Sequence, residues 1–239
     1  MQQADTDPGD PDQTVVIGER EPRLRPRGRV VTFEGGEGAG KSTQVVRLAS
    51  RLRERGLTAL VTREPGGSPG AEAIRHILLS GAVEPLGPEV EAILFAAARG
   101  DHVDSMIRPA LSRGDWVICD RFVDSTRVYQ GATGAVEPRL IAALEAISVG
   151  PFMPDLTLLL DIPAAEGLNR ASERRGLAAI DRFEKDAVDL HERRRTAYLE
   201  LARAEPSRFA VVDASQPVDS VAEAIWYAVS LRLLDVPAP

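Results

Sequence analysis

A glycine-rich segment between an apolar run and an amphipathic run has the composition and spacing of a phosphate-binding loop. Val30–Glu34 is apolar almost to its end, and Gln44–Arg55 carries apolar residues at helical spacing. Backbone N–H groups can surround a phosphate only where side chains do not block its approach, and a helix N-terminus adds positive potential. The spacing Gly-x4-Gly-Lys-Ser therefore predicts a nucleoside triphosphate site formed by Gly35, Gly36, Glu37, Gly38, Ala39, Gly40, Lys41, Ser42 and Thr43.

The use of lysine in the chain supports this prediction. There are two lysines, Lys41 and Lys185, against 27 arginines. Lys41 stands where a compact ammonium group would reach the β- and γ-phosphates, and the hydroxyl of Ser42 would hold Mg²⁺. A surface turn between a strand and a helix is the alternative, but the runs on both sides of the loop favour nucleotide binding.

Two further apolar runs end in residues that could act on the same phosphates. Thr58–Arg63 ends in an arginine that could grip a second anion with two parallel hydrogen bonds, although a plain polar turn is an equal alternative. Trp116–Asp120 ends in an aspartate that suits Mg²⁺ or could cap the next helix. Arg121, which follows it, supplies another fork for anions.

Two helical patterns could contact the rest of a nucleotide. Phe95 and Arg99 are four residues apart, so a ring and a guanidinium lie on one helix face and could hold a base and a phosphate. A core phenylalanine beside a surface arginine is the simpler alternative. A second polar face, either a base-reading edge or a solvated surface, consists of Ser125, Thr126, Tyr129 and Gln130.

The segment Arg170–Arg182 is rich in arginine and could form a lid. Arginines that close over a polyphosphate must arrive after the substrates, which requires a mobile segment, and Gly176 would supply the flexibility. A solvated helix with charge pairs along its surface is the alternative.

Composition excludes several classes of function. The 239 residues suit one domain, and a net charge of −7 argues against nucleic acid or an anionic membrane as a partner. No apolar stretch is long enough to span a bilayer or to form a signal core. Cys119 is the single cysteine, so disulfides and a cysteine zinc site are excluded, and the three histidines lack metal-ligand spacing. We expect a cytoplasmic protein.

Strand-like and helix-like segments alternate along the chain, which predicts an α/β fold with a five-stranded parallel sheet and helices on both faces. Ligands of such sheets gather at the carboxyl ends of the strands. Residues 1–28 are predicted to be a disordered extension and 235–239 a tail. The remaining predicted strands are Leu156–Asp161 and Arg208–Asp213, and the predicted helices are Lys41–Arg55, Ala71–Leu79, Pro88–Arg113, Pro138–Ile147, Ala164–Arg174, Asp186–Ala204 and Val218–Leu234.

From about Arg29 to Leu234, these motifs together resemble the thymidylate kinase family. The family pattern has a Gly-x-Glu-Gly-Ala-Gly-Lys-Ser-Thr-Gln loop, an Arg-Glu-Pro-Gly-Gly element, a Leu-Phe-x-Ala-x-Arg helix and an Asp-Arg-aromatic-x-x-Ser-x-x-x-Tyr-Gln-Gly segment. The resemblance implies a P-loop NTPase-type three-layer fold over 29–234 and transfer of the γ-phosphoryl group of MgATP to dTMP, giving dTDP and ADP. The corresponding segments are Gly35–Gln44, Arg63–Gly67, Leu94–Arg99 and Asp120–Gly131.

The resemblance also implies roles for individual residues. Phe95 would stack on thymine, Arg63 and Arg99 would grip the acceptor phosphate, and Glu37 would approach the deoxyribose hydroxyl. Tyr129 would crowd a ribose 2′-hydroxyl. The other implied contacts are those of Arg121 with the phosphates, of Ser125 and Gln130 with the base and sugar, of Ser42 and Asp120 with Mg²⁺, and of Ser215 and Gln216 with adenine.

One type of the family carries an arginine inside the phosphate loop and another carries it in the lid. Because Gly38 stands at the loop position, the resemblance implies the bacterial lid-arginine type, with Arg174 or Arg175 closing on ATP from a lid at about 170–185. The chain departs from the family pattern on both sides of Arg99, at Ala98 and at Gly100-Asp101.

Two other functions are compatible with parts of the pattern: a kinase for another pyrimidine nucleotide or deoxynucleoside, and a phosphate-loop ATPase that switches a partner. The two separate arginine sites favour two phosphorylated substrates over a switch. The resemblance further implies a homodimer formed through helices, with Pro88–Arg113 as a candidate surface.

Overall fold

A parallel five-stranded β-sheet forms the centre of the protein. The computed structural model describes residues 28–175 and 187–234, with the backbone alone at Arg174 and Arg175. Neighbouring strands, in the order β2-β3-β1-β4-β5, all run parallel, which confirms the predicted fold class. The strands are β1 (Val30–Glu34), β2 (Ala59–Arg63), β3 (Trp116–Asp120), β4 (Leu156–Asp161) and β5 (Phe209–Asp213).

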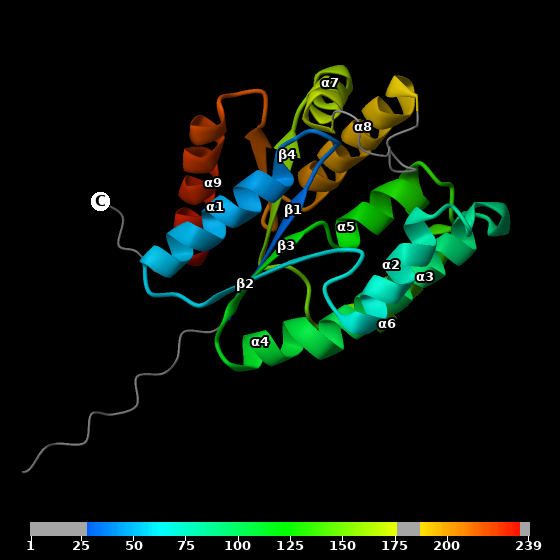
Figure 1. Cartoon of the computed structure of the whole chain (residues 1–239), viewed down its shortest axis with the longest axis horizontal. Coiled ribbons are helices and arrows are strands. Elements are labelled where there is room, and N and C mark those ends of the chain that lie inside the picture. The colour runs from blue at the N-terminus through cyan, green and yellow to red at the C-terminus, as the bar shows by residue number, and fades with distance from the viewer. Residues whose placement is uncertain (1–27, 176–186, 235–239) are drawn as a thin grey trace, which may run out of the picture.

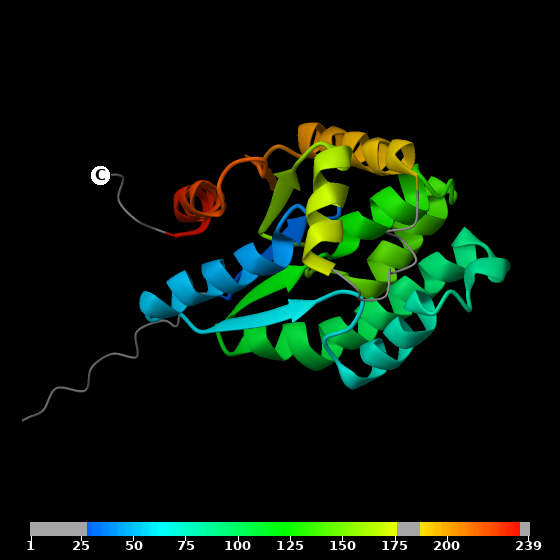
Figure 2. The same cartoon turned by 45° about the horizontal axis from the view of Figure 1, so that its top comes forward.

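Helices cover both faces of the sheet, as Figures 1 and 2 show, and give the molecule three layers. The helices α1 and α9 lie on one face, and α4 and α8 lie on the other. The α-helices are α1 (Lys41–Glu54), α2 (Pro69–Leu79), α3 (Pro88–His102), α4 (Arg108–Ser112), α5 (Val123–Thr126), α6 (Pro138–Ser148), α7 (Ala164–Arg175), α8 (Val188–Ala204) and α9 (Val218–Leu233). A 3-10 helix, η1 (Glu84–Leu86), and two π-helical segments, η2 (Val103–Ile107) and η3 (Arg127–Ala132), complete the described elements.

The three central strands, β3, β1 and β4, are buried because their side chains alternate between apolar clusters on the two faces of the sheet. Val31 and Phe33 of β1 pack with α1 and α9, whereas Val30 packs on the opposite side with α4. In β4, Leu158 belongs to the first core and Leu159 contacts α8. A sheet covered on both faces can present polar groups to a ligand at the ends of its strands, so the fold directs function to that edge.

The predicted long helix Pro88–Arg113 is wrong in its middle. The structure has α3, then the π-helical segment η2, then α4. Pro109 explains the change, because a proline has no N–H and its ring would clash with the carbonyl four residues earlier, that of Ser105. The wider π-helical turn from Val103 to Ile107 accommodates the proline ring, so α3 and α4 remain parts of one continuous helical segment.

Other predicted boundaries agree with the structure to within about two residues, including β2 and β5, which each begin one residue later than predicted. The list of predicted helices omits the segment 123–132, although its polar residues were expected to share a helical face, and the structure has α5 and η3 there. The predicted N-terminal extension up to residue 27, the lid beyond Arg175 and the tail 235–239 lie outside the described residues.

Candidate active site

The carboxyl ends of β1, β2 and β3 meet at a cavity of about 250 Å³. The strand register brings Arg63 beside Asp120, and Phe33 lies on the other side of Asp120. The two predicted arginine sites and the phosphate loop therefore share one cavity. Its lining consists of Glu37, Gly38, Gly40, Lys41, Ser42, Arg63, Glu64, Pro65, Arg75, Leu79, Phe95, Arg99, Asp120, Arg121, Phe122, Ser125, Thr126, Tyr129 and Gln130.

The phosphate loop folds back on its own lysine. The ammonium group of Lys41 is buried and donates hydrogen bonds to the carbonyls of Gly35, at 3.0 Å, and Gly36, at 2.7 Å. Burial lowers the pKa of Lys41, and the neighbouring Arg121 guanidinium lowers it further. The loop thus holds a cation at the start of α1, where the helix N-terminus favours an anion.

Gly38 lies against the backbone of helix α7. A Cβ atom built on Gly38 would lie 1.8 Å from the carbonyl oxygen of Gly167, and one on Gly167 would lie 2.3 Å from that of Glu37. Gly38 also has a φ of +69°, which side chains other than glycine rarely adopt. The loop therefore has no room for an arginine at this position, which gives a steric reason for the glycine that the sequence shows.

We expect Gly38→Ala to lower the free energy of unfolding by about 2 to 4 kcal/mol, from left-handed strain and from collision with backbone that cannot rotate away. Gly36→Ala is the matched control, because a Cβ there meets nothing within 4 Å and the φ of Gly36 is not positive. Urea denaturation of the two nucleotide-free variants and of the wild type measures the free energy of unfolding of each. Equal stability of the two variants would show that the contact between the loop and α7 is not tight.

Ser42 and Asp120 place two oxygen ligands side by side at the cavity. The hydroxyl of Ser42 donates to Oδ2 of Asp120 at 2.7 Å. Hydroxyl and carboxylate oxygens suit Mg²⁺, which usually keeps several waters and takes its other ligands from substrate phosphates. Two oxygen ligands would leave most of the coordination positions of Mg²⁺ to water and phosphate oxygens. Among the described residues, no group of three or more histidine, cysteine or acidic side chains is placed to hold a metal ion.

Arg121 lies at the junction of the phosphate loop and α5. Its guanidinium forms an ion pair with Glu37 and donates to the carbonyl of Gly35 at 3.3 Å and to the hydroxyl of Ser125 at 3.4 Å. The backbone of Arg121 is left-handed, with a φ of 65°. Such a conformation costs a non-glycine residue free energy and is kept only where its surroundings hold it. This strained residue carries a cation into the cavity.

The other two cavity arginines differ in their surroundings. The side chain of Arg63 is 55% exposed and pairs with Glu72 of α2 at 2.8 Å. Arg99 is 3% exposed and pairs with the buried carboxylate of Glu64 at 2.7 Å. It also donates to the hydroxyl of Thr126 at 3.0 Å. Arg63 can therefore turn toward an anion, whereas Arg99 presents a fixed and largely compensated guanidinium.

The far part of the cavity is formed by α3 and η3. Phe95 is half-buried in the lining, so it is not simply a core residue. The amide of Gln130 donates to the buried carboxylate of Glu91 at 2.6 Å, which fixes its orientation. Two guanidinium groups lie over the ring of Tyr129, that of Arg121 at 5.3 Å and that of Arg194 at 4.3 Å from the ring centroid. An aromatic ring and oriented amide are the groups that recognise a planar base.

Ser215 and Gln216 lie outside the residues that line the cavity. Both are exposed and hydrogen-bond to Asp213 at the end of β5. Arg170 of α7 donates to the carbonyls of Ala214 and Ser215, so α7 and this loop are tied together beside the phosphate loop. The position is compatible with the predicted adenine border. The side chains of Arg174 and Arg175 lie outside the described residues.

The sequence prediction missed several residues of the site. Arg75 and Leu79 of α2 line the cavity, and Glu64 orients Arg99. No local pattern distinguishes these residues from ordinary helix or turn residues. Glu34 did give a signal, since it is a charged residue at the end of a strand that is otherwise apolar, directly before the glycine loop. It is fully buried beneath the cavity.

Comparison with known proteins agrees with this arrangement. The family described as thymidylate kinase matches residues 33–225. The chain is 54% identical over 212 residues to a protein named thymidylate kinase from Bradyrhizobium diazoefficiens, covering 89% of this chain and 93% of that protein. Thymidylate kinases of Afipia carboxidovorans and Rhodopseudomonas palustris are 55% and 56% identical, covering 91% and 87% of this chain and 96% and 91% of their own lengths. The chain belongs to the thymidylate kinase family.

Proposed function

We propose that this protein transfers the γ-phosphoryl group of MgATP to dTMP, giving dTDP and ADP. One observation carries the proposal: a single cavity is lined both by a phosphate loop and by a second group of aromatic, amide and guanidinium side chains. A hydrolytic switch needs a site for one nucleotide and water, whereas a kinase needs two phosphorylated substrates to face each other. The names of the three relatives support dTMP as the acceptor.

The phosphate loop would bind ATP. Its N–H groups would surround the β- and γ-phosphates, and the ammonium group of Lys41 would exchange its two loop carbonyls for phosphate oxygens. Mg²⁺, held by Ser42, Asp120 and the phosphates, would supply additional positive charge. Ser215 and Gln216 would border the adenine, and Arg174 or Arg175 would close on the polyphosphate.

The second group of side chains would bind the acceptor. Arg63 and Arg121 are proposed to hold its phosphate, and Phe95 to stack on the base. Arg99, compensated by Glu64, would act as a fixed hydrogen-bond donor to the same nucleotide rather than as an uncompensated charge. Glu37 would lie near the sugar, and the base and sugar would otherwise contact Ser125, Tyr129 and Gln130.

Catalysis by these residues would be electrostatic. The phosphate of a nucleoside monophosphate has a second pKa of about 6, so most of it is doubly ionised at pH 7 and no side chain has to remove a proton. The barrier is the repulsion between two polyanions that must approach in line. Lys41, Arg63, Arg121 and the lid arginine would lower it by compensating the charge and by fixing the two phosphates in line.

A coupled assay of ADP release tests the proposal. We expect turnover with dTMP to exceed that with dCMP, UMP, AMP and thymidine, because the site provides one oriented amide for the base, one crowding tyrosine for the sugar and the guanidinium groups of Arg63 and Arg121 for the acceptor phosphate. The same assay with dUMP measures how far the 5-methyl group of thymine is recognised. Preference for a different monophosphate would assign the kinase another acceptor. ADP release that does not depend on any acceptor would instead indicate an ATPase.

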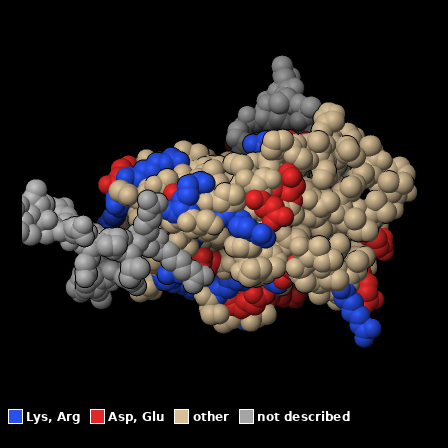
Figure 3. All heavy atoms as spheres, turned by 90° about the horizontal axis from the view of Figure 1, so that it is seen from below, with Lys and Arg blue, Asp and Glu red and all other residues tan. Residues whose placement is uncertain are grey.

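We further propose that the protein forms a homodimer through α2, α3 and α6. Figure 3, which views the molecule from the side of α4 and α6, shows a broad area without charged residues in the half toward α2 and α3. Ile77, Ile93 and Ile147, one from each helix, are exposed. Exposed apolar patches of this kind commonly mark interfaces. Sedimentation equilibrium should give twice the mass of one chain, and a monomer at micromolar concentration would contradict this.

We propose a cytoplasmic location, where ATP is supplied. The single cysteine, Cys119, is buried and free, as is usual for proteins of a reducing compartment. Among the described helices, none combines the length and the apolar character that crossing a bilayer requires.

A further inference from the structure

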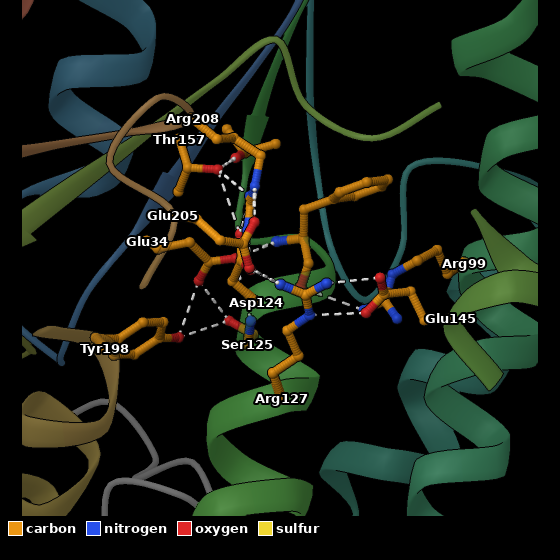
Figure 4. A network of polar contacts seen from close by, with 12 residues as sticks. Glu34, Arg99, Asp124, Ser125, Arg127, Glu145, Thr157, Tyr198, Glu205 and Arg208 are labelled. Carbon is orange, nitrogen blue, oxygen red and sulfur yellow. Dashed lines mark hydrogen bonds and ion pairs between the residues drawn. The ribbon is translucent and has the colours of Figure 1, made fainter. Parts of the chain in front are cut away.

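A buried carboxylate lies directly beneath the cavity and joins three elements of the chain. Glu34, the last residue of β1, is 0% exposed. Oε1 accepts the backbone N–H groups of Phe122 and Ser125 at 2.8 and 3.2 Å, and Oε2 accepts the hydroxyls of Ser125 and Tyr198 at 2.7 and 2.9 Å. Figure 4 shows Tyr198 and Ser125 converging on this carboxylate. Four donors are therefore satisfied by one acceptor-only group.

Two of these hydrogen bonds fix the segment that carries Arg121. The N–H groups of Phe122 and Ser125 belong to the first turn of α5, which has no side-chain cap of its own, so Glu34 acts as the cap from a different strand. Arg121 directly precedes this turn and is left-handed. Its strained backbone is thus held between β3 on one side and the Glu34 carboxylate on the other.

The hydroxyl of Ser125 carries this restraint to the guanidinium of Arg121. Because Ser125 donates its one proton to Glu34, its oxygen is left as an acceptor toward Nη1 of Arg121, at 3.4 Å. The same guanidinium is held by Glu37. Removing the charge of Glu34 would turn the Ser125 hydroxyl around and withdraw one of these supports.

Tyr198 connects the same carboxylate to α8. This helix begins at Val188, directly after the segment in which the lid is predicted. It is fixed to the sheet by Arg195, which pairs with Asp161 of β4 through two hydrogen bonds of 2.7 and 3.0 Å. The hydroxyl of Tyr198 therefore reaches Glu34 from a helix that is itself fixed to β4. The Glu34 carboxylate, which binds both Tyr198 of α8 and Ser125 of α5, thus fixes the position of these two helices relative to each other.

A second network holds the outer side of α5 (Figure 4). Asp124, next to Ser125, is fully buried and accepts two hydrogen bonds from Arg208, at 2.6 and 2.8 Å. Arg127 follows in η3 and forms two hydrogen bonds with Glu145 of α6, at 2.7 and 2.6 Å. The outer side of the segment is therefore fixed by the body of the protein. On the other side, Glu34 holds the N–H groups of the first turn of α5, and Arg99 donates to the carbonyl of Phe122 and the hydroxyl of Thr126.

We propose that Glu34 is a positioning residue for phosphoryl transfer: its ionised carboxylate caps α5 from beneath and orients Ser125, and so sets where Arg121 meets the acceptor phosphate. Glu34 does not touch the substrate in this account. The inference rests on the proposed function, because it assigns the acceptor phosphate as the group that Arg121 must meet.

The electrostatic surroundings make ionisation of Glu34 costly. Burial is the main cause that raises its pKa to about 7, and Asp124 raises it as well, whereas Arg121 and the hydrogen bonds of Ser125 and Phe122 lower it. The other ionisable groups that interact with it are Tyr198 of α8, Tyr129 of η3, Lys41 of α1 and Cys119 of β3. A protonated Glu34 would have to donate one hydrogen and could no longer accept all four bonds.

The test is the variant Glu34→Gln, which keeps the shape and removes the charge. Its amide nitrogen donates where Oε2 accepted, so the hydroxyls of Ser125 and Tyr198 must reverse. We expect kcat/KM for dTMP to fall about 10- to 100-fold, as small misplacements in active sites do, while KM for ATP changes less than about twofold. The wild type should lose kcat/KM as the pH falls below about 7. In Glu34→Gln, kcat/KM should fall only near pH 6, where the substrate phosphate itself takes up a proton.

Asp155→Asn is the matched control. Asp155 accepts the backbone N–H of Val30 at 2.8 Å and pairs with Arg29 at 3.0 Å, but at the opposite end of β1 from the cavity. The Asp155→Asn variant should have a lower free energy of unfolding than the wild type, with unchanged KM values for dTMP and ATP and an unchanged pH profile. A folded Glu34→Gln enzyme with wild-type kinetics would overturn the inference. If Glu34→Gln lowered kcat/KM equally for dTMP and ATP and left the pH profile unchanged, the role of Glu34 would be purely structural and the inference would also be overturned.

A milder variant decides the question if Glu34→Gln does not fold. Tyr198→Phe removes one of the four hydrogen bonds, and a bond of this kind contributes about 1 kcal/mol, or roughly fivefold. We expect kcat/KM for dTMP to fall by about that factor with KM for ATP unchanged. Unchanged kinetics of Tyr198→Phe would refute the inference. Failure of the proposed function would be seen in a different result: the wild type would not phosphorylate dTMP at all.

Discussion

Replacing Lys41 with methionine should lower kcat by about 1,000-fold while the fold is kept. The ammonium group is buried and bound to the carbonyls of Gly35 and Gly36, and no described side chain takes its place at the loop. Methionine has nearly the same length, so the loop loses its charge without losing much packing. A preorganised donor that acts on charge developing in the transition state is commonly worth 100- to 1,000-fold or about 3 to 4 kcal/mol. Single-turnover kinetics at saturating substrates measure the loss.

Arg47→Met is the control for Lys41→Met. Arg47 lies on the same helix α1 but is exposed and pairs with Asp219 of α9, away from the cavity. Its loss removes one positive charge from the helix, so kcat should stay within about twofold, as expected for an exposed ion pair. Near-normal turnover of Lys41→Met, with the thermal unfolding temperature preserved, would exclude Lys41 from the chemistry.

Replacing Phe95 with alanine should raise KM for dTMP about 10- to 100-fold and leave KM for ATP within about twofold. Stacking of a base on an aromatic ring is worth about 1 to 3 kcal/mol, and Phe95 is the half-buried ring on the α3 side of the cavity. Initial rates with each substrate varied in turn separate the two constants. The asymmetry between them is the informative quantity, because a general loss of structure would affect both.

Phe152→Ala is the matched control for the loss of an aromatic side chain. Phe152 is also partly buried, but it packs against the core beneath α4 and contacts Arg108 rather than the cavity. Its removal should lower stability and change neither KM. Equal increases of both KM values in Phe95→Ala would show that Phe95 supports the fold and does not stack on the acceptor.

Features encoded by neighbouring residues were predictable from the sequence. The phosphate loop, Lys41 and Ser42 form one contiguous segment whose glycines and flanking periodicity determine its structure. The strand ends at Arg63 and Asp120 were also predictable, because parallel strands bring their carboxyl ends to one edge and the register pairs these two residues. The cavity that joins them to the loop confirms that the two arginine sites share a pocket.

Features that depend on distant contacts were not predictable. Glu34 and Tyr198 are 164 positions apart, and no local pattern of α8 indicates that its tyrosine reaches the end of β1. The contact of Gly38 with Gly167 likewise depends on how α7 packs across the loop. The start of the helical segment α5–η3 was not predicted for a related reason: its first turn is capped by Glu34 rather than by a residue of its own, so the usual N-terminal signal is absent.

The most direct measurement is a crystal structure of the protein with ADP, Mg²⁺ and dTMP bound together. We expect the β-phosphate of ADP on the N–H groups of the loop at Lys41, and the dTMP phosphate within hydrogen-bonding distance of Arg63 and Arg121, with its base against Phe95. The two phosphates should face each other across the metal at Ser42 and Asp120. If dTMP bound away from this cavity, or if the two nucleotides displaced each other from one position, the account of two anions brought together by these cations would be contradicted.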